Sequence, residues 1–108
     1  MLYEIRVYEC LPGQLPNLHA RFANHTTKLF EKHGIKNVGY WTTEFGESNH
    51  QLTYMLAYDD ANSRMESWAN FRADPEWDRV LEESHKDGQI VKNVQNQLLV
   101  PTPYSPMQ

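Results

Sequence analysis

The reactive side chain with the most informative neighbours is His25. It lies on a stripe of apolar residues, Leu18, Phe22 and Leu29, which step by three and four positions and so share one face of a predicted helix. This spacing predicts that the imidazole is half-buried and points toward a sheet. Such a group can act as a general base or as an axial ligand of a haem. The alternative is a core histidine whose ring is satisfied by a backbone or tyrosine partner.

Aromatic residues make up 12% of the sequence, and some of them are candidates for a ligand cleft. Ligand pockets are mostly apolar with a few polar groups. We therefore expect substrate-binding residues among His25, Trp41, Tyr54 and Trp68, with His25 and Trp68 as facing walls contributed by the two helices. The alternative is that these rings pack only the core and a dimer contact, because aromatic side chains dominate the energetics of both.

Glu4 and Arg6 occupy alternate positions of the first predicted strand and therefore share one face. We expect a structural ion pair there, with Glu44 or Lys92 as a further partner across the sheet or an interface. An arginine that anchors a substrate carboxylate is the alternative interpretation.

The sequence predicts no metal site and no cofactor. His19 and His25 are six positions apart and fall on different sides of a helix, and no H-x-x-x-H pair or Cys–His cluster occurs. The absence of a P-loop, of a G-x-G-x-x-G motif and of a Ser–His–Asp order disfavours nucleotide-dependent enzymes and hydrolases.

Hydrophobic periodicity and turn residues predict strands and helices in the order βαββαβ, with the second helix broken at Asp74-Pro75. Asp59-Asp60 is expected to cap that helix, and Gly39 to mark a bulge or a close contact inside the second strand. The predicted strands are 2–8, 35–45, 51–58 and 90–100, and the predicted helices run from Leu15-Pro16 to Gly34 and from Asp60 to Gly88.

This order predicts an α+β, ferredoxin-like domain over residues 1–100, with both helices on one face of a four-stranded antiparallel sheet. Residues 101–108 are predicted to be an extended Pro-rich C-terminal tail. The second sheet face would be bare in a monomer, although both faces of the central hairpin are apolar. Large bare apolar patches are uncommon on monomers, so we expect a homodimer that buries about 800 Å² or more per subunit, sheet on sheet.

Five short segments follow one another in an order typical of a known family. They are YEIRVY at 3–8, PG at 12–13, VGYWTTEFG at 38–46, AYDD at 57–60 and ADPEW at 73–77. Together they resemble the NIPSNAP family of the dimeric α/β-barrel superfamily, from about Leu2 to Val100. The resemblance implies that two ferredoxin-like sheets pair into a barrel, which agrees with the homodimer expected from the uncovered sheet face.

The resemblance implies little about chemistry, because NIPSNAP domains have no settled activity. Distant superfamily relatives include cofactor-independent monooxygenases and haem-degrading enzymes, which use a cleft between sheet and helices. They imply a small apolar or aromatic metabolite bound in such a cleft, with oxygenase-like or proton-transfer chemistry and His25 as the base. A non-catalytic homodimeric interaction module with a filled core is the alternative, and haem binding through His25 is a third.

Charge and composition narrow the class of partner. The 108 residues carry a formal net charge of −4, which argues against a nucleic-acid groove. No apolar run reaches 18 residues, so we expect no membrane span. The single cysteine, Cys10, cannot form an intrachain disulfide, and the first ten residues do not resemble a signal peptide. We therefore expect a cytoplasmic protein.

Overall fold

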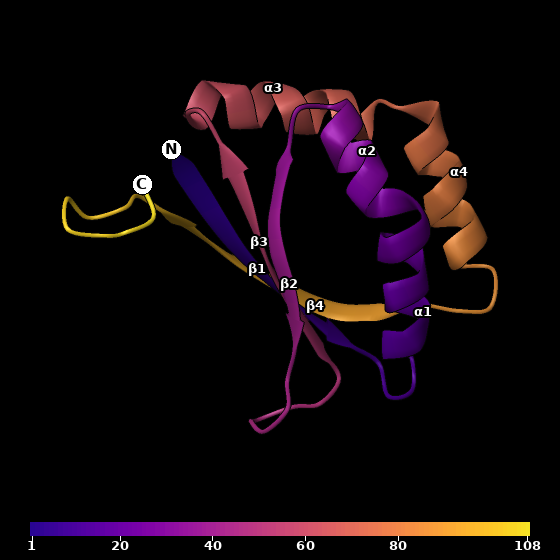
Figure 1. Cartoon of the computed structure of the whole chain (residues 1–108). Helices are drawn as coiled ribbons and strands as arrows, with labels where there is room; N and C mark the ends of the chain where they lie inside the picture. The colour runs from indigo at the N-terminus through magenta and orange to yellow at the C-terminus, as the bar shows by residue number, and fades with distance from the viewer.

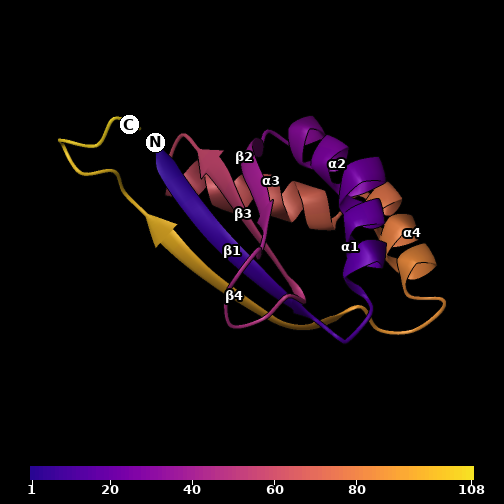
Figure 2. The same ribbon diagram turned by 60° about the horizontal axis from the view of Figure 1, so that its bottom comes forward.

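Four strands form one antiparallel sheet in the order β2-β3-β1-β4. The computed structural model describes all 108 residues, and Figure 1 and Figure 2 show every helix on the same face of this sheet. The strands are β1 (Leu2–Cys10), β2 (Lys36–Thr42), β3 (Gln51–Tyr58) and β4 (Val91–Leu99). The predicted α+β, ferredoxin-like order is confirmed. The second strand ends at Thr42, before its predicted end at Phe45.

The first helical segment is continuous but not uniform. It comprises α1 (Leu15–Arg21), a π-helical turn η1 (Phe22–Thr26) and α2 (Thr27–Lys32). Pro16 lies in the first turn, where its missing N–H costs no hydrogen bond. Gly34 follows the last turn with φ at +79°, a left-handed conformation that suits glycine. The π turn was not predicted, and it changes which side chains face the sheet.

The second helical segment is divided as predicted. The side chain of Asp60 accepts a hydrogen bond of 2.7 Å from the backbone N–H of Ser63 at the start of α3 (Ala61–Arg72). Asp74 does the same for Glu76, at 2.9 Å, at the start of α4 (Pro75–Ser84). A carboxylate followed by proline therefore ends one helix and begins the next.

The structure shows which sheet face meets the helices. Glu4, Arg6 and Tyr8 alternate along β1 on that face, because Arg64 of α3 contacts Glu4 and the Phe22 ring lies 5.8 Å from the Tyr8 ring. The interior between the two layers is packed with aromatic rings. They include Phe22, Phe30, Tyr54, Trp68 and Phe71, none more than 6% exposed.

The opposite sheet face carries no helix. On it, Ile5 of β1 lies opposite Met55 of β3, and Val7 of β1 and Trp41 of β2 lie opposite Thr53. Trp41 is 55% exposed. Figure 2 shows no helix over this face, so these apolar side chains lie on a surface that the helix layer does not cover.

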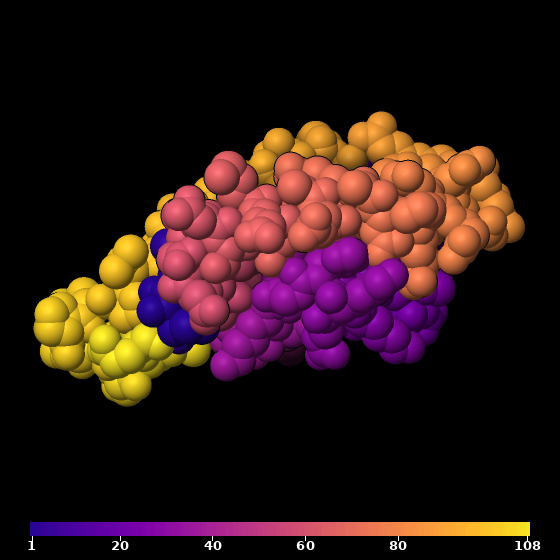
Figure 3. Space-filling model, turned by 90° about the horizontal axis from the view of Figure 1, so that it is seen from above, coloured from indigo at the N-terminus to yellow at the C-terminus, as the bar shows by residue number.

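Strand β4 is an edge strand that the helix layer does not reach. Every residue from Lys92 to Leu98 is exposed, including Val94 at 43% and Leu98 at 48%. Figure 3 shows α3 and α4 packed beside α1, η1 and α2 as one layer, away from the C-terminal tail.

The C-terminal tail is irregular, as predicted, but it is not extended throughout. It turns at Pro103 and Tyr104, and its last residue returns so that the Tyr3 hydroxyl donates a hydrogen bond of 2.8 Å to the backbone carbonyl of Gln108 (Figure 1). The tail is thereby fastened to the first strand. None of the helices has the length and apolar character needed to cross a membrane.

Candidate functional site

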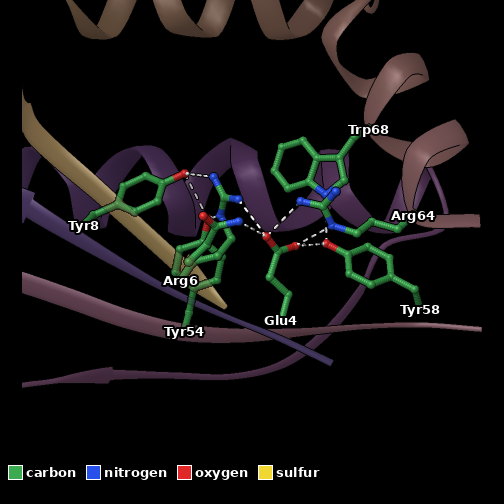
Figure 4. Close-up of polar contacts among 8 residues, drawn as sticks. Glu4, Arg6, Tyr8, Tyr54, Tyr58, Arg64 and Trp68 are labelled. Atoms are coloured by element: carbon green, nitrogen blue, oxygen red, sulfur yellow. Dashed lines mark hydrogen bonds and ion pairs between the residues drawn. The ribbon is translucent and has the colours of Figure 1, made fainter. Parts of the chain in front are cut away.

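A buried carboxylate, Glu4, lies at the centre of a polar network between the sheet and α3 (Figure 4). Its side chain is fully buried and accepts five hydrogen bonds from four residues. They come from Arg64 Nε at 3.1 Å and Nη2 at 2.9 Å, Arg6 Nη1 at 3.1 Å, Tyr58 Oη at 2.6 Å and Asn96 Nδ2 at 2.8 Å. Strands β1, β3 and β4 and helix α3 are therefore joined through one side chain.

Arg6 extends the network along the sheet. Its Nε donates to the Tyr54 hydroxyl at 2.8 Å and its Nη2 to the Tyr8 hydroxyl at 3.2 Å. The guanidinium also lies 4.8 Å from the centre of the Trp68 ring, close enough for a cation–π contact. All three nitrogens of Arg6, one of which bonds Glu4, are thus engaged within the protein.

The protonation states make this network a scaffold. Burial by itself would raise the pKa of Glu4, but hydrogen bonds from Arg64, Tyr58 and Asn96, with the charge of Arg6, lower it to about 2. Burial and the hydrogen bond to Glu4 raise the pKa of Tyr58. Near neutral pH the carboxylate stays ionised and the phenol stays protonated, so neither is poised to exchange a proton. The network positions β1 against α3.

An apolar groove lies between η1 and the edge strand β2. We use this name for a hollow of about 420 Å³ whose apolar lining comes mainly from Phe22, Tyr40, Trp41 and Leu52. Gly39 allows the Trp41 indole to lie close to the strand, because a Cβ at that position would be 2.6 Å from the ring. The register also shifts between residues 37 and 39, so Gly39 marks both a bulge and a close contact. The sequence predicts either a bulge or a close contact at Gly39.

A polar cavity of about 240 Å³ lies between the first helical segment and α4. His25 lines it, together with the buried Arg21 and with Ser84 of α4. The prediction that His25 is half-buried and faces the sheet is therefore wrong, since the residue is exposed.

The π turn explains the position of His25. The backbone N–H of Thr27 bonds the carbonyl of Phe22, five residues earlier, and the Thr26 hydroxyl bonds the carbonyl of Arg21, also five residues earlier. The wider turn advances the inward stripe by one residue, so that Thr26, 2% exposed, replaces His25 on it.

The four predicted substrate-binding residues are not brought together. Trp41 lines the apolar groove and His25 lines the polar cavity, while Tyr54 and Trp68 are buried in the aromatic interior. The expectation that His25 and Trp68 form facing walls of one cleft is wrong, because Trp68 lies against Arg6 and donates from its indole nitrogen to Tyr58.

Two arginines, Arg64 and Arg21, were not identified from the sequence as residues of these sites. Arg64 is the main partner of Glu4, whereas Glu44 and Lys92 are exposed and do not contact it. The signal was the spacing of Arg64 and Trp68, which lie four residues apart and so share a helix face. Arg21 was missed because an arginine among the polar positions of a helix normally faces solvent.

Comparison of the sequence with protein-family models assigns the chain to one family. A family model described as NIPSNAP matches residues 3–106 of the chain. The chain belongs to the NIPSNAP family. No functionally curated protein matches it. The family assignment covers the sheet, both helical segments and most of the C-terminal tail.

Solved structures of other NIPSNAP proteins have the same fold. Protein Atu4242 from Agrobacterium tumefaciens is 26% identical over 100% of both chains, with a TM-score of 0.88, and has also been described as a NIPSNAP family protein with unknown function. An uncharacterized NIPSNAP domain protein from Burkholderia xenovorans is 23% identical, with a TM-score of 0.85 over 98% of this chain and 99% of its own.

The fold extends beyond NIPSNAP proteins. A putative antibiotic biosynthesis monooxygenase from Nitrosomonas europaea has a TM-score of 0.64 over 94% of this chain and 98% of its own, at 7% identity. This similarity concerns the fold alone. In this NIPSNAP chain, no group of three or more His, Cys, Asp or Glu side chains is arranged to hold a metal ion.

Proposed function

We propose that this protein is a homodimeric binding protein for a small apolar or aromatic molecule, held in the apolar groove. The observation that carries the proposal is the lining of the groove, where the rings of Phe22 and Tyr40 and the side chain of Leu52 give one largely apolar surface. Its volume of about 420 Å³ is within the usual range for ligand pockets, about 300–1,000 Å³.

The two groups considered above for proton transfer lie outside the apolar groove, although His19 is among its lining residues. Glu4 is saturated with hydrogen bonds and stays ionised. His25, the candidate base, lines the polar cavity and not the apolar groove. A ligand in the groove would therefore meet neither group.

The uncovered sheet face supports the homodimer. Ile5, Val7 and Met55 are only half-buried there, and Trp41 is 55% exposed. No helix of the structure covers them, and a second copy would bring the same apolar side chains to the contact. A stable dimer of this kind buries about 800 Å² per partner. Trp41 would then lie where the groove meets the dimer contact.

A filled interior favours a second candidate, a homodimeric interaction module that binds no small molecule. The rings between sheet and helices are buried, with Tyr54 0% and Phe30 1% exposed. Both candidates require the dimer, and they differ in whether the apolar groove takes a ligand.

Titration with 1-naphthol, a flat and neutral aromatic probe, distinguishes them. The three tryptophan indole N–H signals resolve in a nitrogen–proton NMR spectrum, and Trp41→Phe assigns one of them. We expect a saturable shift of the Trp41 signal with the Trp68 signal unchanged. Ala23→Arg fills the groove from its exposed helical side and should weaken binding at least about tenfold, or 1.4 kcal/mol. Ala69→Arg, exposed on α3, is the matched control. The absence of a saturable shift of the Trp41 signal would contradict ligand binding in the apolar groove and favour the interaction module.

The dimer is tested by light scattering after gel filtration. We expect twice the mass of the chain, and a shift toward the monomer for Met55→Lys, which places a charge on the uncovered face. Met65→Lys is the control, because Met65 is 67% exposed on α3, away from that face. A monomer mass at all concentrations would contradict both candidates.

A further inference from the structure

Arg21 is a buried cation that no acidic group neutralises. It is 7% exposed, and its guanidinium takes part in none of the five ion pairs of the structure. Nη1 donates a long hydrogen bond of 3.3 Å to Ser84 Oγ, and Nε is buried without any hydrogen-bond partner. The remaining contact is with the Trp77 ring, whose centre lies 5.6 Å away. Arg6 and Arg64, by contrast, both pair with Glu4.

An unpaired buried charge is costly to keep. Moving an ion out of water costs several kcal/mol even after the protein relaxes, and only a counter-charge or good hydrogen bonds repay that cost. Burial accordingly lowers the pKa of Arg21, although a guanidinium remains protonated at any physiological pH. A methionine or leucine would fill the same space without this penalty. The charge is explained if something outside the chain neutralises it.

The surroundings of Arg21 are those of a binding site. The residue lines the polar cavity, whose volume is about 240 Å³. Asn17, Asn24 and His25 from the first helical segment line it as well, with Ser84 from α4. Amide, imidazole and hydroxyl groups thus surround a guanidinium that has free hydrogen-bonding capacity.

Two acidic residues that also line the polar cavity restrict the ligand. Glu83 and Asp87 both line it, and Glu83 is paired with Lys86 at 3.0 Å. A polyanion such as phosphate would be repelled by these carboxylates. A molecule with one carboxylate and one cationic group matches this mixed lining, because the guanidinium of arginine binds carboxylates and the two acidic side chains attract a cation.

We propose that the polar cavity binds a free α-amino acid, with the carboxylate on Arg21 and the ammonium group toward Glu83 and Asp87. The side chain of the ligand then occupies the remaining volume, near His25 and Asn24. This site is separate from the apolar groove, which shares no lining residue with it.

The test is a thermal-shift and calorimetric titration of the full chain with each standard amino acid, with propionate and inorganic phosphate for comparison. We expect at least one amino acid to raise Tm in a saturable way, propionate to bind more weakly and phosphate to have no effect. Arg21→Met should leave Tm without ligand unchanged or higher, and should weaken amino-acid binding at least about tenfold. Arg79→Met, exposed on α4, should bind like the wild type.

A second variant keeps the proposal testable if Arg21→Met does not fold. Asp87→Asn lies at an exposed position and should weaken amino-acid binding while it strengthens propionate binding, because one repulsive charge is removed. The proposal is overturned if no amino acid gives a saturable response, if phosphate binds in place of amino acids, or if neither Arg21→Met nor Asp87→Asn changes the affinity.

Discussion

The guanidinium of Arg64 binds the carboxylate of Glu4 through two nitrogens, Nε to Oε1 and Nη2 to Oε2, and so joins α3 to β1 across 60 positions of the sequence (Figure 4). Glu4 is fully buried, whereas the Arg64 side chain is 25% exposed. The pair is therefore reached from solvent only on the arginine side. Its geometry fixes the distance between the sheet and the helix layer, and the first two predictions about stability depend on it.

Glu4→Gln should destabilise the protein by about 3 kcal/mol, because it leaves the charges of Arg6 and Arg64 partly buried without a counter-charge. The free energy of unfolding in urea at pH 7 measures this. Glu66→Gln is the matched control, since Glu66 is exposed on α3 and forms no ion pair. Equal stability of the two variants would show that the network contributes nothing.

The contribution of Glu4 should depend on pH in one direction. Its pKa is about 2 in the folded protein and 4.5 for the free side chain, so its stabilisation is present above about pH 4.5 and is lost as the pH falls toward 2. The difference amounts to about 3 kcal/mol. Unfolding free energies of wild type and Glu4→Gln, measured from pH 7 to pH 2.5, should converge on acidification.

The comparison with Glu4→Gln is needed because a second carboxylate loses stabilisation over the same range. Hydrogen bonds from Lys32 and His33 and from the backbone of Glu76 lower the pKa of Asp74 as well. That effect is common to both proteins and cancels in the difference. A constant gap between the two curves down to pH 2.5 would contradict the assigned protonation of Glu4.

Several boundaries of the helices were predictable because their signals are local. Asp60 and the Asp74-Pro75 pair begin helices through bonds to backbone groups two or three residues away, and Gly34 ends one through its own φ angle. Alternation alone also showed that Glu4 and Arg6 share a face. None of these inferences needs knowledge of the rest of the chain.

The site could not be predicted, because it depends on non-local contacts and on one irregular turn. Helical periodicity predicts that His25 faces the sheet. The π turn cannot be recognised from that periodicity, and because of it Thr26 faces the sheet instead. Periodicity likewise favours Met65 as an inward residue of α3, because it is apolar and three positions from Trp68, although it is 67% exposed. The side chain of Arg64 points toward the sheet instead, because it binds Glu4 on β1, which is distant in the sequence.

Gly39→Ala should displace the Trp41 indole with little loss of stability. A Cβ at residue 39 would lie 2.6 and 2.8 Å from two ring atoms, but the ring is 55% exposed and free to move away. We expect a change of less than about 0.5 kcal/mol in the free energy of unfolding. Tryptophan emission should nevertheless change in intensity or wavelength. In a Trp41→Phe background the substitution should leave emission unaltered, and a change that persists there would contradict the contact.

His25→Ala should leave the stability within about 0.5 kcal/mol of the wild type, because the side chain is exposed and alanine favours a helix. The adjacent substitution Thr26→Ala is the matched comparison. It removes a buried hydroxyl that donates a hydrogen bond of 3.3 Å to the carbonyl of Arg21 inside the π turn, and it should cost about 1–2 kcal/mol. Urea denaturation of both variants gives the two values. A larger loss of stability for His25→Ala than for Thr26→Ala would show that His25, and not Thr26, faces the sheet. It would contradict the π turn as the cause of the exposure of His25.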